Sequence, residues 1–181
     1  FGSDQGPLDF EYSINCRHLV ATSVEGWASL LTYLRGFRGL GRTLKFTGPP
    51  AHPVALLVEE QRVRPAWSFQ WMLRLLDVVD ALEGRGYAPV SGEMVLAVED
   101  ALFPENRGPW RVVAEGGVVS VSSGDSGGDR VRPISIGTLS SLYSGFLSAY
   151  DAVGLGLVDE AEAPGLARLF GGPAPWMHDF F

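Results

Sequence analysis

Residues 67–87 read WSFQWMLRLLDVVDALEGRGY, and the rest of the chain can be organised around this stretch. Apolar residues alternate with other side chains over Trp67–Leu73, a period of two that predicts a strand. Asp77 can cap a following helix, because its carboxylate can accept hydrogen bonds from the free N–H groups of the first turn. Gly84 and Gly86 are expected to end that helix in a left-handed C-cap. The stretch therefore predicts an apolar strand that leads into an amphipathic helix.

Composition limits the class of protein. The chain has 181 residues, 46% hydrophobic and 19% charged, which fits a globular protein of one or two small domains. Its net charge of −7 argues against a nucleic-acid surface. A single cysteine, Cys16, excludes an internal disulfide and a multi-cysteine zinc site. No apolar run approaches the ~20 residues of a membrane span, and no signal peptide is visible. We expect a cytoplasmic protein without a membrane span or a nucleic-acid partner.

Patterns on either side of residues 67–87 predict a mixture of strands and helices. Before it, we predict a strand over 8–20 and a helix from a Thr22–Glu25 capping box to Gly36. A short strand over 43–46 and a short helix from Pro53 should follow. After it, the predicted elements are strands over 94–98 and 131–136, a hairpin over 110–122 turning at Gly116–Gly117, a helix from Thr138 to Gly145, and helices over 150–153 and 160–170. This order indicates an α+β fold.

Several motifs in this order resemble one known family. They are Arg74–Val78 (RLLDV), Asn106–Trp110 (NRGPW), Ile136–Leu139 (IGTL) with Leu142–Gly145 (LYSG), and Pro175–Phe181 (PWMHDFF). Together they resemble the C-terminal region of the Eis-like (enhanced intracellular survival) GNAT N-acetyltransferases. The resemblance implies that residues 1–65 are the latter half of a central GNAT-like domain that does not bind acetyl-CoA. It implies that residues 66–181 are a sterol-carrier-protein-like domain, a mostly antiparallel sheet packed with helices.

The same resemblance implies a function. Eis-like enzymes transfer acetyl from acetyl-CoA to a primary amine and form homo-oligomers, often hexamers. Acetyl-CoA would be bound by an N-terminal GNAT domain of the same protein, outside this chain, so this fragment alone should be inactive. The chain begins with Phe1 rather than Met, which supports the expectation of a longer protein. No metal is implied.

The end of the chain carries the candidate site. Three aromatic residues fall within the last six, although a free terminus is usually polar and frayed. In Eis-like enzymes the C-terminal carboxylate enters the active site of the N-terminal domain and helps deprotonate the amine, and Phe181 matches that position. Asp179 and Trp176 are the expected substrate-binding residues. The alternative is that this hydrophobic tail only staples the domain.

Two other functions remain open at this stage. A sterol-carrier-like fold can enclose an apolar cavity, so the chain could be a lipid or sterol carrier without catalysis. We expect Trp67, Trp71 and Trp110 to be core residues, and the alternative is that they line such a cavity. The chain could also be a purely structural oligomerisation module.

Three further motifs have simpler explanations. The run GDSGG at 124–128 copies the surroundings of a serine-protease nucleophile, but no suitable histidine setting precedes it, and a flexible hairpin loop explains it. The glycine-rich run 36–41 follows a helix, whereas a phosphate loop should follow a strand, so we expect a turn. His18, His52 and His178 could hold a metal only if the fold gathers them.

Overall fold

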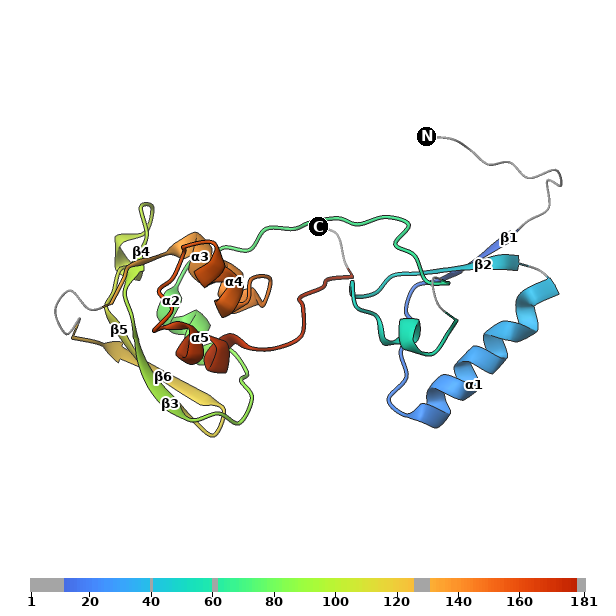
Figure 1. The fold of residues 1–181 in the computed structure, drawn as a ribbon, viewed down its shortest axis with the longest axis horizontal. Coiled ribbons are helices and arrows are strands. Elements are labelled where there is room, and N and C mark those ends of the chain that lie inside the picture. Colours follow the sequence, from blue (N-terminus) through green and yellow to red (C-terminus); the bar gives the residue numbers. More distant parts are fainter. Residues whose placement is uncertain (1–11, 40, 60–61, 126–130, 179–181) are drawn as a thin grey trace. The chain divides into compact units, whose positions relative to one another are not determined.

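The structure is a computed structural model that describes residues 12–39, 41–59, 62–125 and 131–178. It divides into two compact units, each with its own internal contacts (Figure 1). Unit 1 comprises the described residues of Phe1–Arg64 and of Trp176–Phe181, and unit 2 is Pro65–Pro175. The chain therefore leaves unit 1 after Arg64, builds unit 2, and contributes to unit 1 again from Trp176.

Unit 1 is built on a pair of parallel strands. Strand β1 (Tyr12–Cys16) pairs with β2 (Gly41–Phe46), and helix α1 (Val24–Arg35) with the short 3-10 helix η1 (Gly36–Gly39) connects them. Two parallel strands run in the same direction, so the chain must return from the end of the first to the start of the second through a long crossover connection. A second 3-10 helix, η2 (Pro53–Leu56), follows β2 and begins at a proline, as predicted.

The N-cap of α1 differs from the prediction by one residue. Ser23, not Thr22, is the N-cap, and its Oγ accepts a hydrogen bond from the Gly26 N–H at 3.0 Å. Both residues can cap, so the sequence pattern alone does not decide between them. The helix ends at Arg35, close to the predicted end at Gly36.

Unit 2 contains a three-stranded antiparallel sheet with helices beside it. The sheet order is β3 (Gly92–Leu96), β5 (Trp110–Glu115) and β6 (Val118–Ser123). The predicted hairpin joins β5 to β6, and its turn holds Gly116 and Gly117 at φ +58° and +91°, a conformation that glycine adopts without strain. The predicted α+β fold, with an antiparallel sheet packed against helices, is confirmed.

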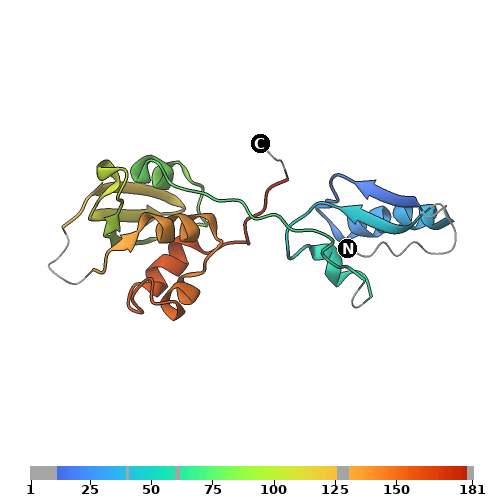
Figure 2. The same ribbon diagram turned by 90° about the horizontal axis from the view of Figure 1, so that it is seen from above.

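The remaining elements of unit 2 surround this sheet. A parallel pair is formed by β4 (Val98–Glu99) and β7 (Ile134–Ser135), and a 3-10 turn η3 spans Pro104–Asn106. The helices are α2 (Val78–Gly84), α3 (Ile136–Ser144), α4 (Ala149–Gly154) and α5 (Ala163–Phe170). Figure 2 shows α3, α4 and α5 gathered on one side of the sheet. The core between them includes fully buried Leu82, Leu96, Leu139, Leu142 and Leu166.

The start of helix α2 agrees with the prediction from the sequence, whereas its C-cap differs. Asp77 is its N-cap, and its Oδ1 accepts from the Asp80 N–H at 2.9 Å. The C-cap is Arg85 in an extended conformation, and neither Gly84 nor Gly86 adopts a positive φ. The Arg85 guanidinium donates to the Tyr143 carbonyl at 2.6 Å, which holds the C-cap residue against α3.

The predicted strand at Trp67–Leu73 is wrong. This segment has no regular secondary structure, and the exposed fractions of Trp67 and Met72 are 69% and 99%. Among the described residues it has no partner strand, so the alternating pattern has nothing to pair with. Trp67 is accordingly not a core residue, whereas Trp71 and Trp110 are half-buried.

The N-cap of α3 is also displaced from its predicted residue. Ser135 caps this helix, and its Oγ accepts from the Thr138 N–H at 3.1 Å. Thr138 is buried in the first turn instead of preceding it. Gly145 ends the helix as predicted, in a left-handed C-cap at φ +79°.

Candidate functional site

His52 forms the rigid part of a pocket in unit 1. It is the N-cap of η2, and its Nδ1 accepts from the Val54 N–H at 3.2 Å. Its Nε2 lies 3.0 Å from the Leu19 carbonyl oxygen, which can only accept, so Nε2 carries the donated proton. Both ring nitrogens are thus used by the backbone. His52 holds the segment around Leu19 in place and has no nitrogen free for proton transfer.

Aromatic side chains surround His52. The Phe46 and Trp27 rings meet it edge-on, with centroids 4.8 and 5.8 Å away. Leu19 and Val54 are buried on either side, with exposed fractions of 2% and 3%. This small cluster fixes the end of β2, the start of α1 and η2 against one another.

The tail of the chain lies beside this cluster, within unit 1. The His178 ring is stacked on the His18 ring, with centroids 3.9 Å apart and the planes tilted by 35°. Trp176 meets His178 edge-on at 6.5 Å. His178 is half-buried, and its buried Nδ1 has no hydrogen-bond partner among the described residues. Ring contacts, rather than hydrogen bonds of the His178 ring, therefore hold this part of the tail.

Trp176 of the tail lines an open pocket of about 170 Å³. Its lining comes from the segment after β1, from α1, from the loop around η2 and from the tail: His18, Leu19, Val20, Ala21, Trp27, Thr47, Pro49, His52, Pro53 and Trp176. An apolar cavity of ~150 Å³ is large enough for one benzene ring. The pocket of unit 1 is therefore suited to a single aromatic ring or a short aliphatic chain.

The sequence-predicted site residues are only partly within the described chain. Trp176 lies in the wall of this pocket, with 42% of its side chain exposed. Asp179 and Phe181 lie outside the described residues. His18 and His178 were considered in the sequence only as metal ligands, and their stacking was missed. No local pattern signals it, because the two residues belong to distant parts of the chain.

In the described part of the chain, the three histidines make other contacts. Among the residues that the structure describes, no group of three or more His, Cys, Asp and Glu side chains could hold an ion. The His18 and His178 rings contact each other with their planes tilted by 35°, and His52 donates to and accepts from the backbone.

The glycine-rich run after α1 forms a turn, as expected. Gly36–Gly39 is the 3-10 helix between α1 and β2, so the local order is helix, turn, strand. A phosphate cradle needs a loop that opens a helix, whose free N–H groups point at the anion. The Gly36–Gly39 turn therefore does not have the geometry of a phosphate cradle. Ser126 of the GDSGG run lies outside the described residues.

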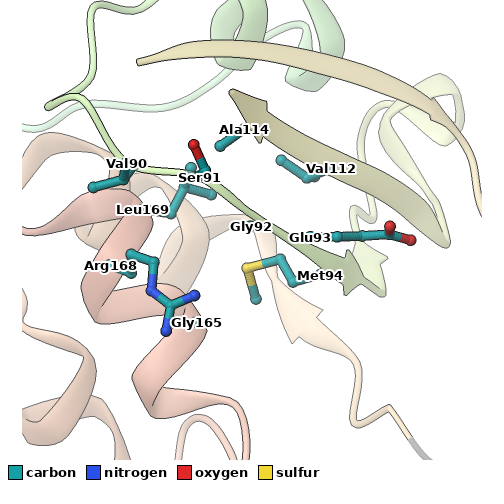
Figure 3. A pocket seen from close by; sticks show the side chains of 10 residues that line it. All are labelled: Val90, Ser91, Gly92, Glu93, Met94, Val112, Ala114, Gly165, Arg168 and Leu169. Carbon is teal, nitrogen blue, oxygen red and sulfur yellow. The ribbon is translucent and has the colours of Figure 1, made fainter. Parts of the chain in front are cut away.

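Unit 2 has a second pocket, between β3 and α5 (Figure 3). Figure 3 shows Met94 and Arg168 facing each other across it, with the apolar Val112 and Leu169 behind. Its volume is about 30 Å³, room for about one or two water molecules. Pockets that bury drug-sized ligands are typically ~300–1,000 Å³. This pocket is too small for a sterol or a fatty-acid chain.

Comparison with known proteins shows which family this fold belongs to. The family model described as "Sterol carrier protein domain" matches residues 78–178, more than half of the chain. The chain belongs to the sterol carrier protein domain family. The matched region begins at α2, includes the whole three-stranded sheet and ends at His178 in the tail.

Relatives of this sterol-carrier-family chain are named N-acetyltransferases. It is 35% identical over 126 residues to an uncharacterized N-acetyltransferase of Streptomyces coelicolor, covering 66% of this chain and 30% of that protein. It is 36% identical over 115 residues to an uncharacterized N-acetyltransferase of Streptomyces avermitilis, covering 60% and 27% respectively. The chain thus spans less than a third of the length of the curated relatives it matches.

Solved structures similar to this chain are also N-acetyltransferases or Eis proteins by name. A GCN5-related N-acetyltransferase from Anabaena variabilis matches with TM-score 0.84 and 28% identity, over 93% of this chain and 44% of that chain. Another from Kribbella flavida matches with TM-score 0.80 and 31% identity, over 96% and 44%. Eis1 from Mycobacterium abscessus matches with TM-score 0.69 and 25% identity, over 93% and 43%. The resemblance to Eis-like GNAT acetyltransferases is confirmed.

In the described part of the chain, no helix is both long enough and apolar enough to cross a membrane.

Proposed function

We propose that this chain is the C-terminal portion of a longer Eis-like N-acetyltransferase, which transfers acetyl from acetyl-CoA to a primary amine. The observation that carries the proposal is the match to GCN5-related N-acetyltransferases over 93–96% of this chain but only 44% of theirs. In this proposal residues 1–65 are the latter half of a central GNAT-like domain, and residues 66–181 are the sterol-carrier-like domain. Acetyl-CoA binds to an N-terminal GNAT domain outside this chain.

Within this chain, the proposed contribution to catalysis comes from the tail. The α-carboxylate of Phe181 accepts the proton that the substrate amine loses as it becomes a nucleophile. An α-carboxylate ordinarily has a pKa near ~3.5, so it is a weak base in water. It must act from a desolvated position or through a bridging water to be effective. Trp176 and Asp179 are proposed to line the amine-binding side.

Two assays test this proposal. The full-length protein should acetylate a primary amine with acetyl-CoA, whereas residues 1–181 alone should show no transfer. Calorimetric titration of the same chain with acetyl-CoA should show no measurable binding. Micromolar binding to this chain, or an inactive full-length protein over a broad panel of amines, would contradict the assignment.

The alternative of a lipid or sterol carrier receives less support. The pocket of unit 2 holds about 30 Å³, far below what an acyl chain or a sterol needs. Binding of a fluorescent fatty-acid probe to this chain with displacement by unlabelled lipid would favour the carrier.

Self-association is the remaining part of the proposal. Segment 67–76 exposes Trp67, Phe69, Met72 and Leu76 by 60% or more each. Exposed apolar patches of a few hundred Å² or more mark interaction sites, and four such side chains in this short segment make it a candidate. We propose that it is covered by a second copy of the full-length protein. Light scattering should report an oligomer, and a monomer at micromolar concentration would contradict this.

A further inference from the structure

We propose that His18 and His178 are positioning residues that fix the tail on unit 1. Their stacked rings form a clasp, by which we mean this ring pair only. The expected effect of the clasp on acetyl transfer rests on the proposed function. Its expected effect on the position of the tail does not depend on any activity.

His18 is a rigid base for this contact. It follows β1 by two residues, and β1 is held by its parallel pairing with β2. The next residue, Leu19, is 2% exposed, and its carbonyl accepts the hydrogen bond from His52 Nε2. The backbone of His18 is therefore held on both sides, by a strand and by a buried anchor.

His178, in contrast, belongs to a segment that secondary structure does not hold. The described residues after α5, 171–178, contain no helix or strand. The position of this segment within unit 1 depends on side chains: Trp176 in the pocket wall and His178 on His18. Among the described residues no hydrogen bond holds the His178 ring, so its placement depends on the ring contacts with His18 and Trp176.

The clasp limits where the end of the chain can be. Phe181 follows His178 by three residues, and an extended chain advances by at most ~3.6 Å per residue. The Cα atom of Phe181 can therefore be at most about 11 Å from the Cα atom of His178. A pair of aromatic rings in contact favours the docked state by roughly 2- to 12-fold.

Hydrogen exchange of the tail amides, read by mass spectrometry on residues 1–181 and on the full-length protein, tests the clasp. We expect His18→Ala and His178→Ala each to speed exchange within 174–178 by about 2- to 12-fold. The double variant should be no faster than His178→Ala alone, because His178→Ala already removes the ring contact with His18. His18→Phe keeps a ring at this position and should restore protection. Tyr33→Ala removes an exposed ring of α1 that meets Phe37 edge-on, and it should leave the tail unchanged.

The outcomes separate the clasp from the proposed function. Unchanged tail exchange in both His18→Ala and His178→Ala, or additive effects in the double variant, would overturn the clasp. If His18→Ala fails to fold, the other two variants still test the clasp. His18→Phe retains a ring at this position, and His178→Ala alters only the tail. In the full-length enzyme, kcat should fall with tail protection while KM for acetyl-CoA stays constant. Faster exchange with unchanged kcat would confirm the clasp and remove the tail from the mechanism.

Discussion

The carboxylate of Asp100, 2% exposed, is paired with the guanidinium of Arg74 from the segment that precedes α2. The same carboxylate accepts hydrogen bonds from the backbone N–H groups of Leu102 and Phe103 and from the side chain of Asn106. Burial acts to raise the pKa of Asp100, but these hydrogen bonds and the charge of Arg74 outweigh it and lower the pKa from 3.8 to about 2. The cluster joins the start of α2 to the loop after β4.

The first prediction concerns acid stability. Between pH 3.8 and about 2 the unfolded chain binds a proton at Asp100 and the folded chain does not, so lowering the pH favours unfolding. The stability that Asp100 contributes should be complete above about pH 5 and should decline as the pH falls through this range. Asp100→Asn has no such titration. Urea unfolding of both proteins across pH 2–7 should therefore show curves that converge in acid, and a constant difference would contradict this assignment.

Asn106 supports the same cluster through three contacts. Its side-chain amide donates to the Leu76 carbonyl and to Asp100, and its Oδ1 accepts from the Val78 N–H, all at 3.0 Å. Asn106→Ala should lower the free energy of unfolding by about 1–3 kcal/mol, because buried partners lose their hydrogen bonds. Glu105→Ala, an exposed neighbour in η3, should change it by less than about 0.5 kcal/mol. Equal effects in urea unfolding would show that the cluster is not a stabilising unit.

A pair of glycines tests the C-cap of α3. Gly145 has φ +79°, and an added Cβ would lie 3.3 Å from the Pro173 carbonyl oxygen. Gly145→Ala should therefore destabilise unit 2 by about 1–2 kcal/mol. Gly154, at the end of α4, has open space around it, and Gly154→Ala should stabilise by about 0.4–1 kcal/mol. Thermal melts of the two variants should shift in opposite directions, and a shift of the same sign would be inconsistent with this geometry.

Local signals in the sequence predict much of this fold. Asp77 begins α2, Gly116–Gly117 turns the hairpin, and Gly145 ends α3, because each position needs a specific residue type for a local backbone reason. The N-caps were misplaced where a nearby residue could also cap. Thr22 was predicted where Ser23 caps α1, and Thr138 was predicted where Ser135 caps α3. Those errors leave the helices in place.

Contacts between distant parts of the chain could not be read from local patterns. The alternation of Trp67–Leu73 predicted a strand, but a strand forms only where another chain segment supplies backbone partners. The stacking of His178 on His18 depends on the path of the whole chain between them. The pocket of unit 1 has the same origin, since its wall joins the segment after β1 to Trp176 in the tail.

The most direct test of the account is to move the C-terminal carboxylate of the full-length enzyme. Appending a few residues after Phe181 displaces the carboxylate and keeps every side chain, whereas Phe181→Ala removes a side chain and keeps a carboxylate at the same place. If the carboxylate accepts the proton of the amine, the extension should lower kcat, with acetyl-CoA saturating, by ~10²–10⁴-fold, and Phe181→Ala should lower it much less. Equal kcat in the extended and native enzymes would contradict the account and leave the tail as a hydrophobic staple.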